Sequence, residues 1–175
     1  MRAAPFSRSC SKVSDKNITT PPSALVPTAL TTPDAVAIIS FVTHSAEETT
    51  AWGREFAQRL TAPALVLLTG DLGTGKTTLT KGIVAGLGAA NENDVTSPTF
   101  TLVHVYGKSK KVFHADLYRI ESFRDFETLG MEDMFDEPAI AILEWSERFP
   151  LEAPWPQVRI RLEHLGQDQR RITVY

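Results

Sequence analysis

The chain has 175 residues, of which 42% are hydrophobic and 22% are charged, and its formal net charge is −3. This length and composition fit one folded domain with a tail, and the net charge argues against a surface that is basic throughout and grips nucleic acid. The only cysteine, Cys10, excludes an internal disulfide framework and fits a reducing compartment, and no apolar stretch approaches the length that crosses a bilayer. We therefore expect a cytoplasmic protein without a membrane anchor.

Residues 1–34 differ in composition from the rest of the chain. They are rich in Ser, Thr, Pro and Ala, and a segment with so little large apolar surface is disordered by default. Basic residues among serines give it a faint likeness to a transit peptide, but it lacks the apolar core of a secretory signal. We favour a disordered extension, or a predicted start site placed too far upstream, over a targeting segment. We assign one domain to residues 35–175.

The first elements of that domain alternate between strand and helix. Residues 37–42 read as a strand, and Ser45 followed by Glu48 has the pattern of a capping box at the start of a helix. Residues 64–69 form an unbroken apolar run that is typical of a parallel strand buried on both faces. A glycine-rich loop follows directly, then a helix whose apolar residues recur every four positions, and Gly88 can end it in a left-handed cap.

The second half of the domain predicts more strands. Two are expected around residues 100–106 and 111–117, then a short helix at 123–129 and a buried strand at 139–143. Residues 158–164 and 170–175 alternate apolar and polar side chains and read as a hairpin that turns near residues 166–168. These elements predict a three-layer α/β P-loop NTPase domain with a mostly parallel sheet and a C-terminal β-hairpin.

Residues 70–77, with the sequence Gly-Asp-Leu-Gly-Thr-Gly-Lys-Thr, match the phosphate-binding pattern G-x-x-x-x-G-K-[ST] in full. Such a loop points successive backbone N–H groups at phosphate oxygens, and the helix that follows adds its positive N-terminal end. Its lysine reaches the outer phosphates, and its last hydroxyl can bind magnesium. The residues expected to contact the nucleotide are Gly73, Thr74, Gly75, Lys76, Thr77 and Thr78.

Two acidic residues are candidates for the carboxylate that such a site needs at the end of a neighbouring strand. Glu144 directly follows the apolar run 139–143. The alternative interpretation is that it is an ordinary acidic residue at the end of a strand. Asp116 shares one strand face with His114 and can form a structural ion pair with Arg119 instead. We interpret His114 as a packed strand histidine and Trp145 as a packing residue.

Residues 97–99, Ser-Pro-Thr, lie between the expected helix and the next strand, where a threonine in P-loop switches can bind magnesium or sense the γ-phosphate. Alone, this tripeptide is equally typical of a turn. The Asn-Lys-x-Asp sequence that reads guanine in Ras-type GTPases is absent from the chain, so ATP is favoured over GTP.

The ordered set of motifs resembles the TsaE (YjeE) family, the P-loop ATPase of bacterial tRNA threonylcarbamoyladenosine biosynthesis. The set comprises the phosphate loop, Val-Thr-Ser-Pro-Thr-Phe at 95–100, His-Ala-Asp-Leu-Tyr-Arg at 114–119, Leu-Gly at 129–130, and Ile-Leu-Glu-Trp at 142–145. The resemblance covers residues from about Ser45 to Glu163 and is far more specific than the phosphate loop alone.

The resemblance implies roles that spacing does not. Thr77 and Glu144 would hold magnesium, Asp116 would be needed for hydrolysis, and Thr99 would belong to a switch-like segment. An arginine of the last hairpin, Arg170 or its competitor Arg171, would approach the nucleotide. ATP and magnesium would be the cofactors, TsaD and TsaB would be the partners whose turnover hydrolysis supports, and tRNA would be met only indirectly.

Two other functions remain open at this point. One is a small-molecule kinase that uses the same phosphate loop, for which residues 123–136 would be short lid material with Arg124 as its arginine. The other is a non-hydrolysing module in which ATP fixes a binding surface.

Overall fold

The computed structural model describes residues 38–108, 111–127, 137–149 and 155–175. The expected extension 1–34 and the last part of the helix expected at 123–129 lie outside these residues. The Leu-Gly pair at 129–130 and most of the suggested lid at 123–136 also lie outside them.

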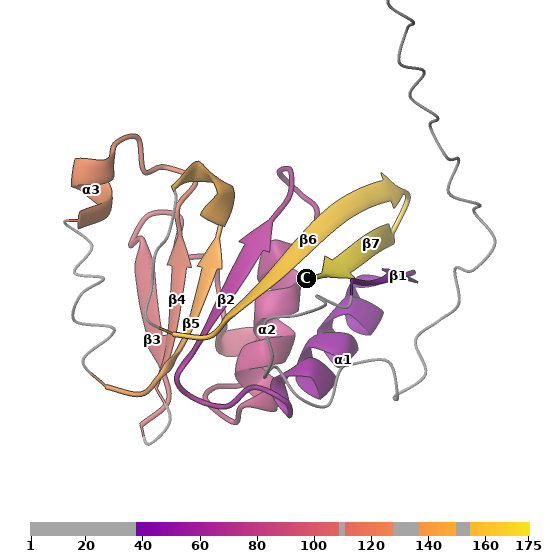
Figure 1. The fold of residues 1–175 in the computed structure, drawn as a ribbon. Coiled ribbons are helices and arrows are strands. Elements are labelled where there is room, and N and C mark those ends of the chain that lie inside the picture. The colour runs from indigo at the N-terminus through magenta and orange to yellow at the C-terminus, as the bar shows by residue number, and fades with distance from the viewer. Residues whose placement is uncertain (1–37, 109–110, 128–136, 150–154) are drawn as a thin grey trace, which may run out of the picture.

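A single sheet of seven strands forms the centre of the domain, in the order β1-β7-β6-β2-β5-β4-β3 (Figure 1). Strands β6, β2, β5 and β4 are parallel to one another, whereas β1, β7 and β3 pair antiparallel with their neighbours. The strands are β1 (Ile39–Thr43), β2 (Ala64–Thr69), β3 (Val103–Tyr106), β4 (Val112–Asp116), β5 (Ile140–Glu144), β6 (Gln157–Gly166) and β7 (Gln169–Val174). The mostly parallel core and the C-terminal hairpin are confirmed.

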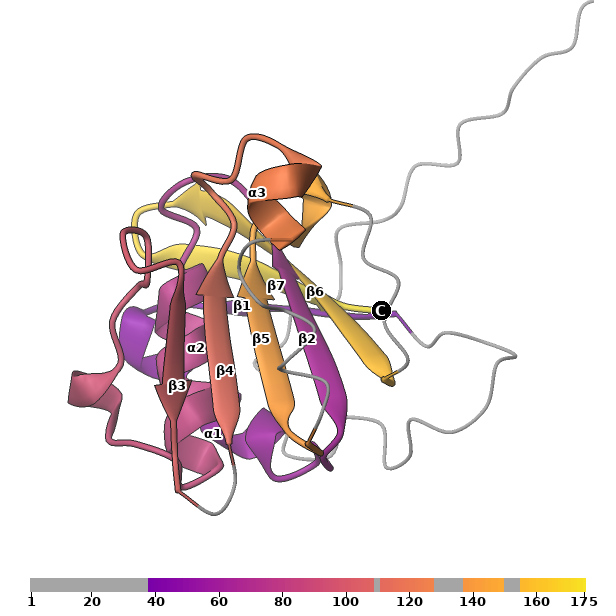
Figure 2. The ribbon, with the colours of Figure 1, turned by 90° about the vertical axis from the view of Figure 1, so that its left-hand side faces the viewer.

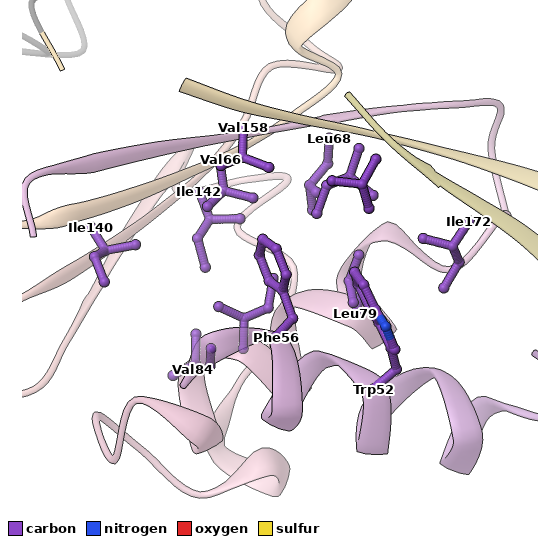
Figure 3. Packing of buried hydrophobic residues seen from close by; sticks show 14 of the residues in the cluster. Trp52, Phe56, Val66, Leu68, Leu79, Val84, Ile140, Ile142, Val158 and Ile172 are labelled. Carbon is purple, nitrogen blue, oxygen red and sulfur yellow. The ribbon is translucent and has the colours of Figure 1, made fainter. Parts of the chain in front are cut away.

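Helices α1 (Ala46–Ala57) and α2 (Lys76–Gly86) lie side by side on one face of the sheet (Figures 1 and 2). Aromatic residues of α1 and aliphatic residues of α2 fill the space below the strands, as Figure 3 shows. Trp52 stacks on Phe56, and both side chains are at least 95% buried. Burial of this apolar surface is the main force that holds the two helices against the sheet.

The opposite face of the sheet carries a second, smaller apolar cluster. Leu65, Leu67 and Leu143 point to this side, where Phe126 of α3 (Phe123–Glu127) and Trp155 pack on them. The predicted third layer is therefore present, but in the described part of the chain it consists of the five-residue helix α3 and loop side chains. Two short 3-10 helices, η1 (Glu92–Asp94) and η2 (Ser146–Arg148), complete the elements of the described residues.

Local signals in the sequence set several of the boundaries. The Ser45 hydroxyl accepts a hydrogen bond from the Glu48 N–H at 3.1 Å, so the predicted N-cap of α1 is confirmed. Gly88 follows α2 with a φ of 69°, as a left-handed C-cap requires. The strand expected at 100–106 begins only at Val103, because residues 100–102 form a turn in which Leu102 has a φ of 67°.

The parallel pairing brings three strand ends to one edge of the sheet. Glu144 is in register with Leu68 on one side and with Asp116 on the other. The glycine-rich loop leaves β2 at the same edge, directly after Thr69. Ligands of parallel α/β sheets bind at this carboxyl edge, so the fold collects the predicted site residues in one place.

Candidate nucleotide-binding site

Backbone conformation sets the shape of the glycine-rich loop. Gly70, Gly73 and Gly75 have φ values of 133°, 81° and 97°, a region that other residues rarely enter. At Gly70 a Cβ atom would also lie 2.2 Å from the Leu162 carbonyl oxygen of β6. The first glycine is therefore required twice, for its conformation and for close contact with the sheet.

Lys76 is the first residue of α2, and its side chain folds back over the loop. It is 5% exposed, and its Nζ donates hydrogen bonds to the carbonyl oxygens of Gly70 at 2.6 Å and Asp71 at 2.8 Å. The ammonium also lies 3.8 Å from the centre of the Trp145 ring. Burial lowers the pKa of Lys76, and the carboxylates of Glu144 and nearby acids oppose that shift. The loop thus holds a cation at the place where a phosphate chain would lie.

Thr77 and Glu144 form a pair of oxygen ligands across the site. The Thr77 hydroxyl donates to Glu144 Oε2 at 3.0 Å, and Glu144, at the end of β5, is 2% exposed. Hydroxyl and carboxylate oxygens are the protein ligands that magnesium prefers, usually together with phosphate oxygens and water. The two predicted metal ligands are therefore brought together, and their chemistry fits magnesium.

His114 is hydrogen-bonded to the other carboxylate oxygen of Glu144. This bond was not predicted from the sequence. The His114 Nε2 lies 2.8 Å from Glu144 Oε1, and the ring is fully buried. His114 is thus a buried strand histidine, as interpreted, but it is also bonded to the candidate metal ligand. The signal for this was its place two residues before Asp116, on the strand face that looks into the site.

Asp116 ends β4 and is bound by the Ser-Pro-Thr segment. Its Oδ2 accepts hydrogen bonds from the hydroxyls of Ser97 at 2.8 Å and Thr99 at 2.7 Å, and its Oδ1 accepts from the Tyr118 N–H at 3.0 Å. Arg119, the alternative ion-pair partner, instead has its guanidinium over the Phe100 ring at 4.2 Å. The structure therefore brings Thr99 and Asp116 together.

Arg170 reaches the loop from β7. Its side chain lies so close to Gly75 that a Cβ atom there would be 2.8 Å from Arg170 Nε. That Nε is buried without a hydrogen-bond partner among the described residues, while Nη1 donates to the Asp168 carbonyl at 2.8 Å. A buried donor beside a glycine-rich loop fits an anionic ligand. Arg170, and not Arg171, lines the pocket.

These side chains surround one open pocket with a volume of about 340 Å³, within the range of small-molecule sites. Trp145, with a φ of 61°, packs against Tyr118 and also forms part of the pocket wall. The Thr74 side chain does not reach this pocket, because it is 2% exposed and donates to the Asp71 carbonyl at 2.9 Å. The lining residues are Leu72, Gly73, Gly75, Lys76, Thr77, Thr78, Ser97, Thr99, Asp116, Tyr118, Glu144, Trp145 and Arg170.

A comparison with protein families identifies the chain. Residues 43–172 match the family described as threonylcarbamoyl adenosine biosynthesis protein TsaE. The chain belongs to the TsaE family. This match spans the phosphate loop, both carboxylates and the hairpin arginine, so the whole candidate site lies in the part of the chain that the TsaE family shares.

Individual TsaE proteins agree with this assignment. The chain is 38% identical to the tRNA threonylcarbamoyladenosine biosynthesis protein TsaE of Treponema pallidum, over 76% of this chain and 97% of that protein. It is 35% identical to the protein of the same name from Bacillus subtilis, over 75% of this chain and 81% of that one. A crystal structure of Bacillus subtilis YdiB superposes with a TM-score of 0.59 and 30% identity, covering 80% of this chain and 86% of that one.

Two kinds of feature are absent from the described residues. In the ranges that the structure describes, no helix is long and apolar enough to cross a membrane. The same residues contain no group of three or more His, Cys, Asp or Glu side chains placed to hold a metal ion.

Proposed function

We propose that this TsaE family member binds ATP with magnesium and hydrolyses it to support the modification of tRNA with threonylcarbamoyladenosine. Membership of the TsaE family supports the assignment to threonylcarbamoyladenosine biosynthesis. The observation that carries the enzymatic part is the convergence of a phosphate loop, the Thr77–Glu144 oxygen pair and a second carboxylate, Asp116, on one pocket.

Binding would rest on the loop and on the two cations beside it. The loop amides and the N-terminal end of α2 favour phosphate oxygens. Lys76 would exchange its bonds to the Gly70 and Asp71 carbonyls for bonds to the outer phosphates. Arg170, whose Nε is buried without a partner among the described residues, would contribute a second positive charge beside Gly75.

Thr77 and Glu144 would hold magnesium. When bound, the metal neutralises charge on the phosphates and helps to align them for attack by water. Asp116 is a different kind of group, since hydroxyl and amide donors surround it and neither Thr77 nor Lys76 bonds to it in the structure. We assign it to orient the attacking water, because a carboxylate can accept a hydrogen bond from that water.

The partners proposed for this cycle are TsaD and TsaB. The segment at 97–99 is bonded to Asp116 by two hydroxyl groups, so a change at the phosphates that moves Asp116 would also move this segment. A partner that reads residues 97–99 would then change ATP affinity, and ATP would change partner affinity by the same factor. This link is why we expect weak hydrolysis by the chain alone and faster hydrolysis with the partners.

The test is steady-state phosphate release from ATP with and without purified TsaD and TsaB. Wild type should be stimulated by the pair. Thr99→Ala should still bind ATP but lose much of the stimulation, because Asp116 loses one of its two bonds to the segment at 97–99. If the pair leaves wild-type hydrolysis unchanged, the partner role is wrong.

The same assay separates the other two functions. A small-molecule kinase would release little phosphate alone and would transfer it to an added acceptor. A non-hydrolysing module would bind ATP and the partners with no phosphate release under any condition.

A further inference from the structure

The two carboxylate oxygens of Glu144 have separate surroundings. Oε2 faces the pocket and accepts from the Thr77 hydroxyl at 3.0 Å. Oε1 points away from it, toward His114 Nε2 at 2.8 Å and the Thr80 hydroxyl at 3.4 Å. One oxygen is thus available to a ligand in the pocket while the other is bonded to the protein interior.

The hydrogen-bond geometry defines which ring nitrogen of His114 carries hydrogen. Because a carboxylate only accepts, Nε2 must be the donor to Glu144. Nδ1 is buried and has no partner among the described residues, so a hydrogen there would be an unsatisfied buried donor. The tautomer with hydrogen on Nε2 alone donates to Glu144 and leaves no unsatisfied donor at Nδ1.

Neighbouring elements hold the His114 ring in place. Tyr106 of β3 stacks beside it with ring centres 6.5 Å apart, and the Tyr106 hydroxyl lies 3.1 Å from His104 Nδ1. His114 itself is fully buried on β4, which lies between β5 and the edge strand β3. A ring held on β4 is a fixed point against which the longer side chain of Glu144 can be oriented.

We propose that His114 is a positioning residue that fixes Glu144 so that Oε2 faces the magnesium site. The inference rests on the proposed magnesium–ATP site. Without the Nε2–H donor, the Glu144 carboxylate would lose its stronger interior bond and could rotate away from Thr77. Groups that orient metal ligands in this way typically change metal affinity by about 10- to 100-fold when they are removed.

The experiment measures ATP affinity of the full chain with magnesium and with EDTA, and the ratio of the two is the readout. His114→Leu removes the donor and should reduce this ratio by about 10-fold or more, with metal-free affinity unchanged because the phosphate loop is intact. His114→Gln, whose side-chain amide can donate from nearly the same position, should keep most of the ratio. Val112→Ala, on the same face of β4, is the control for a loss of stability without a change at Glu144.

The outcomes distinguish this inference from the function it rests on. If wild type binds ATP with no magnesium dependence, both are overturned. If wild type depends on magnesium and His114→Leu keeps the full dependence, only the positioning role is overturned. Equal losses in His114→Leu, His114→Gln and Val112→Ala would reduce His114 to a packing residue and would also overturn it.

A measurement on the wild-type chain needs no variant to fold. Nitrogen-15 NMR of labelled histidine distinguishes the two ring tautomers. His114 should show hydrogen on Nε2, and its signals should shift when magnesium is added with ATP. A ring with hydrogen on Nδ1 alone would overturn the proposal, because it could not donate to Glu144.

Discussion

Glu144 and Asp116 end neighbouring strands in direct register, yet their surroundings differ. Glu144 is bonded to Thr77 and His114, whereas Asp116 is bonded to Ser97 and Thr99. Two carboxylates at one sheet edge can therefore have separate roles, and their different neighbours support the proposed division between a metal ligand and a group that orients water.

Substituting each carboxylate tests this division. Glu144→Gln should reduce the magnesium dependence of ATP binding by about 10-fold or more, because one charged metal ligand becomes neutral. Asp116→Asn should keep that dependence and lose hydrolysis. ATP titrations with and without magnesium, together with phosphate release, measure both, and the reverse pattern would mean that the two assignments are exchanged.

Lys76 is the residue whose loss should affect ATP most directly. Lys76→Ala should weaken ATP binding by about 10- to 100-fold, since hydrogen bonds to charged groups contribute about 1.5–3 kcal/mol. Lys81→Ala, one and a half turns along the same helix, removes an equal charge outside the pocket lining and serves as the control. Wild-type ATP affinity in a folded Lys76→Ala variant would refute the phosphate-loop assignment.

At the scale of the element, the glycine-rich loop depends on its contact with β6. Gly70 combines a φ of 133° with the 2.2 Å approach of a Cβ atom to the Leu162 carbonyl, whereas Gly73 has a φ of 81° and open space around it. The two positions therefore differ in steric restriction, although both lie in the same loop and both are glycine.

This difference predicts unequal effects of alanine. Gly73→Ala should lower the free energy of unfolding by about 1–2 kcal/mol, the cost of a left-handed conformation. Gly70→Ala should lower it further, by about 3 kcal/mol or more, because backbone atoms of β2 and β6 cannot separate without breaking their pairing. Denaturant unfolding of both variants measures the difference, and equal losses would contradict the role assigned to the Leu162 contact.

At the scale of the whole molecule, the site depends on how closely α1 and α2 approach. Gly82 of α2 faces α1, and a Cβ atom there would lie 2.2 Å from the Thr50 carbonyl oxygen. At Gly53 of α1, a Cβ atom would lie 2.8 Å from the Leu79 carbonyl oxygen of α2. The two glycines let the helices lie side by side on the sheet, with α2 placed to start at the phosphate loop.

The sign of the change in stability caused by Gly82→Ala shows whether helix propensity or packing dominates at this position. Propensity alone would stabilise the chain by about 1 kcal/mol, because alanine favours a helix over glycine. The backbone contact predicts instead a net loss, since overpacking typically costs about 1–3 kcal/mol and here the neighbour is backbone. Thermal and denaturant unfolding give the sign, and a gain in stability would show that the helices separate at little cost.

Much of this molecule follows from local patterns in the sequence. Ser45 and Gly88 mark helix ends through bonds and angles that involve only nearby residues. The apolar run at 64–69 and the alternating hairpin strands have periods that define strands wherever they lie. The phosphate loop is likewise marked by a short sequence pattern, and the predicted residues Gly73, Gly75 and Lys76 do line the pocket.

Other features depend on contacts between residues distant in the chain, which no local pattern contains. The bond from His114 to Glu144 joins residues 30 positions apart and exists because β4 and β5 are neighbours in register. The sequence by itself determined the elements, the phosphate loop and the family, because each is encoded in short stretches of chain. Only the tertiary structure decided which hairpin arginine lies beside the loop and which side chain is bonded to the second oxygen of Glu144, because strand order and register determine those contacts.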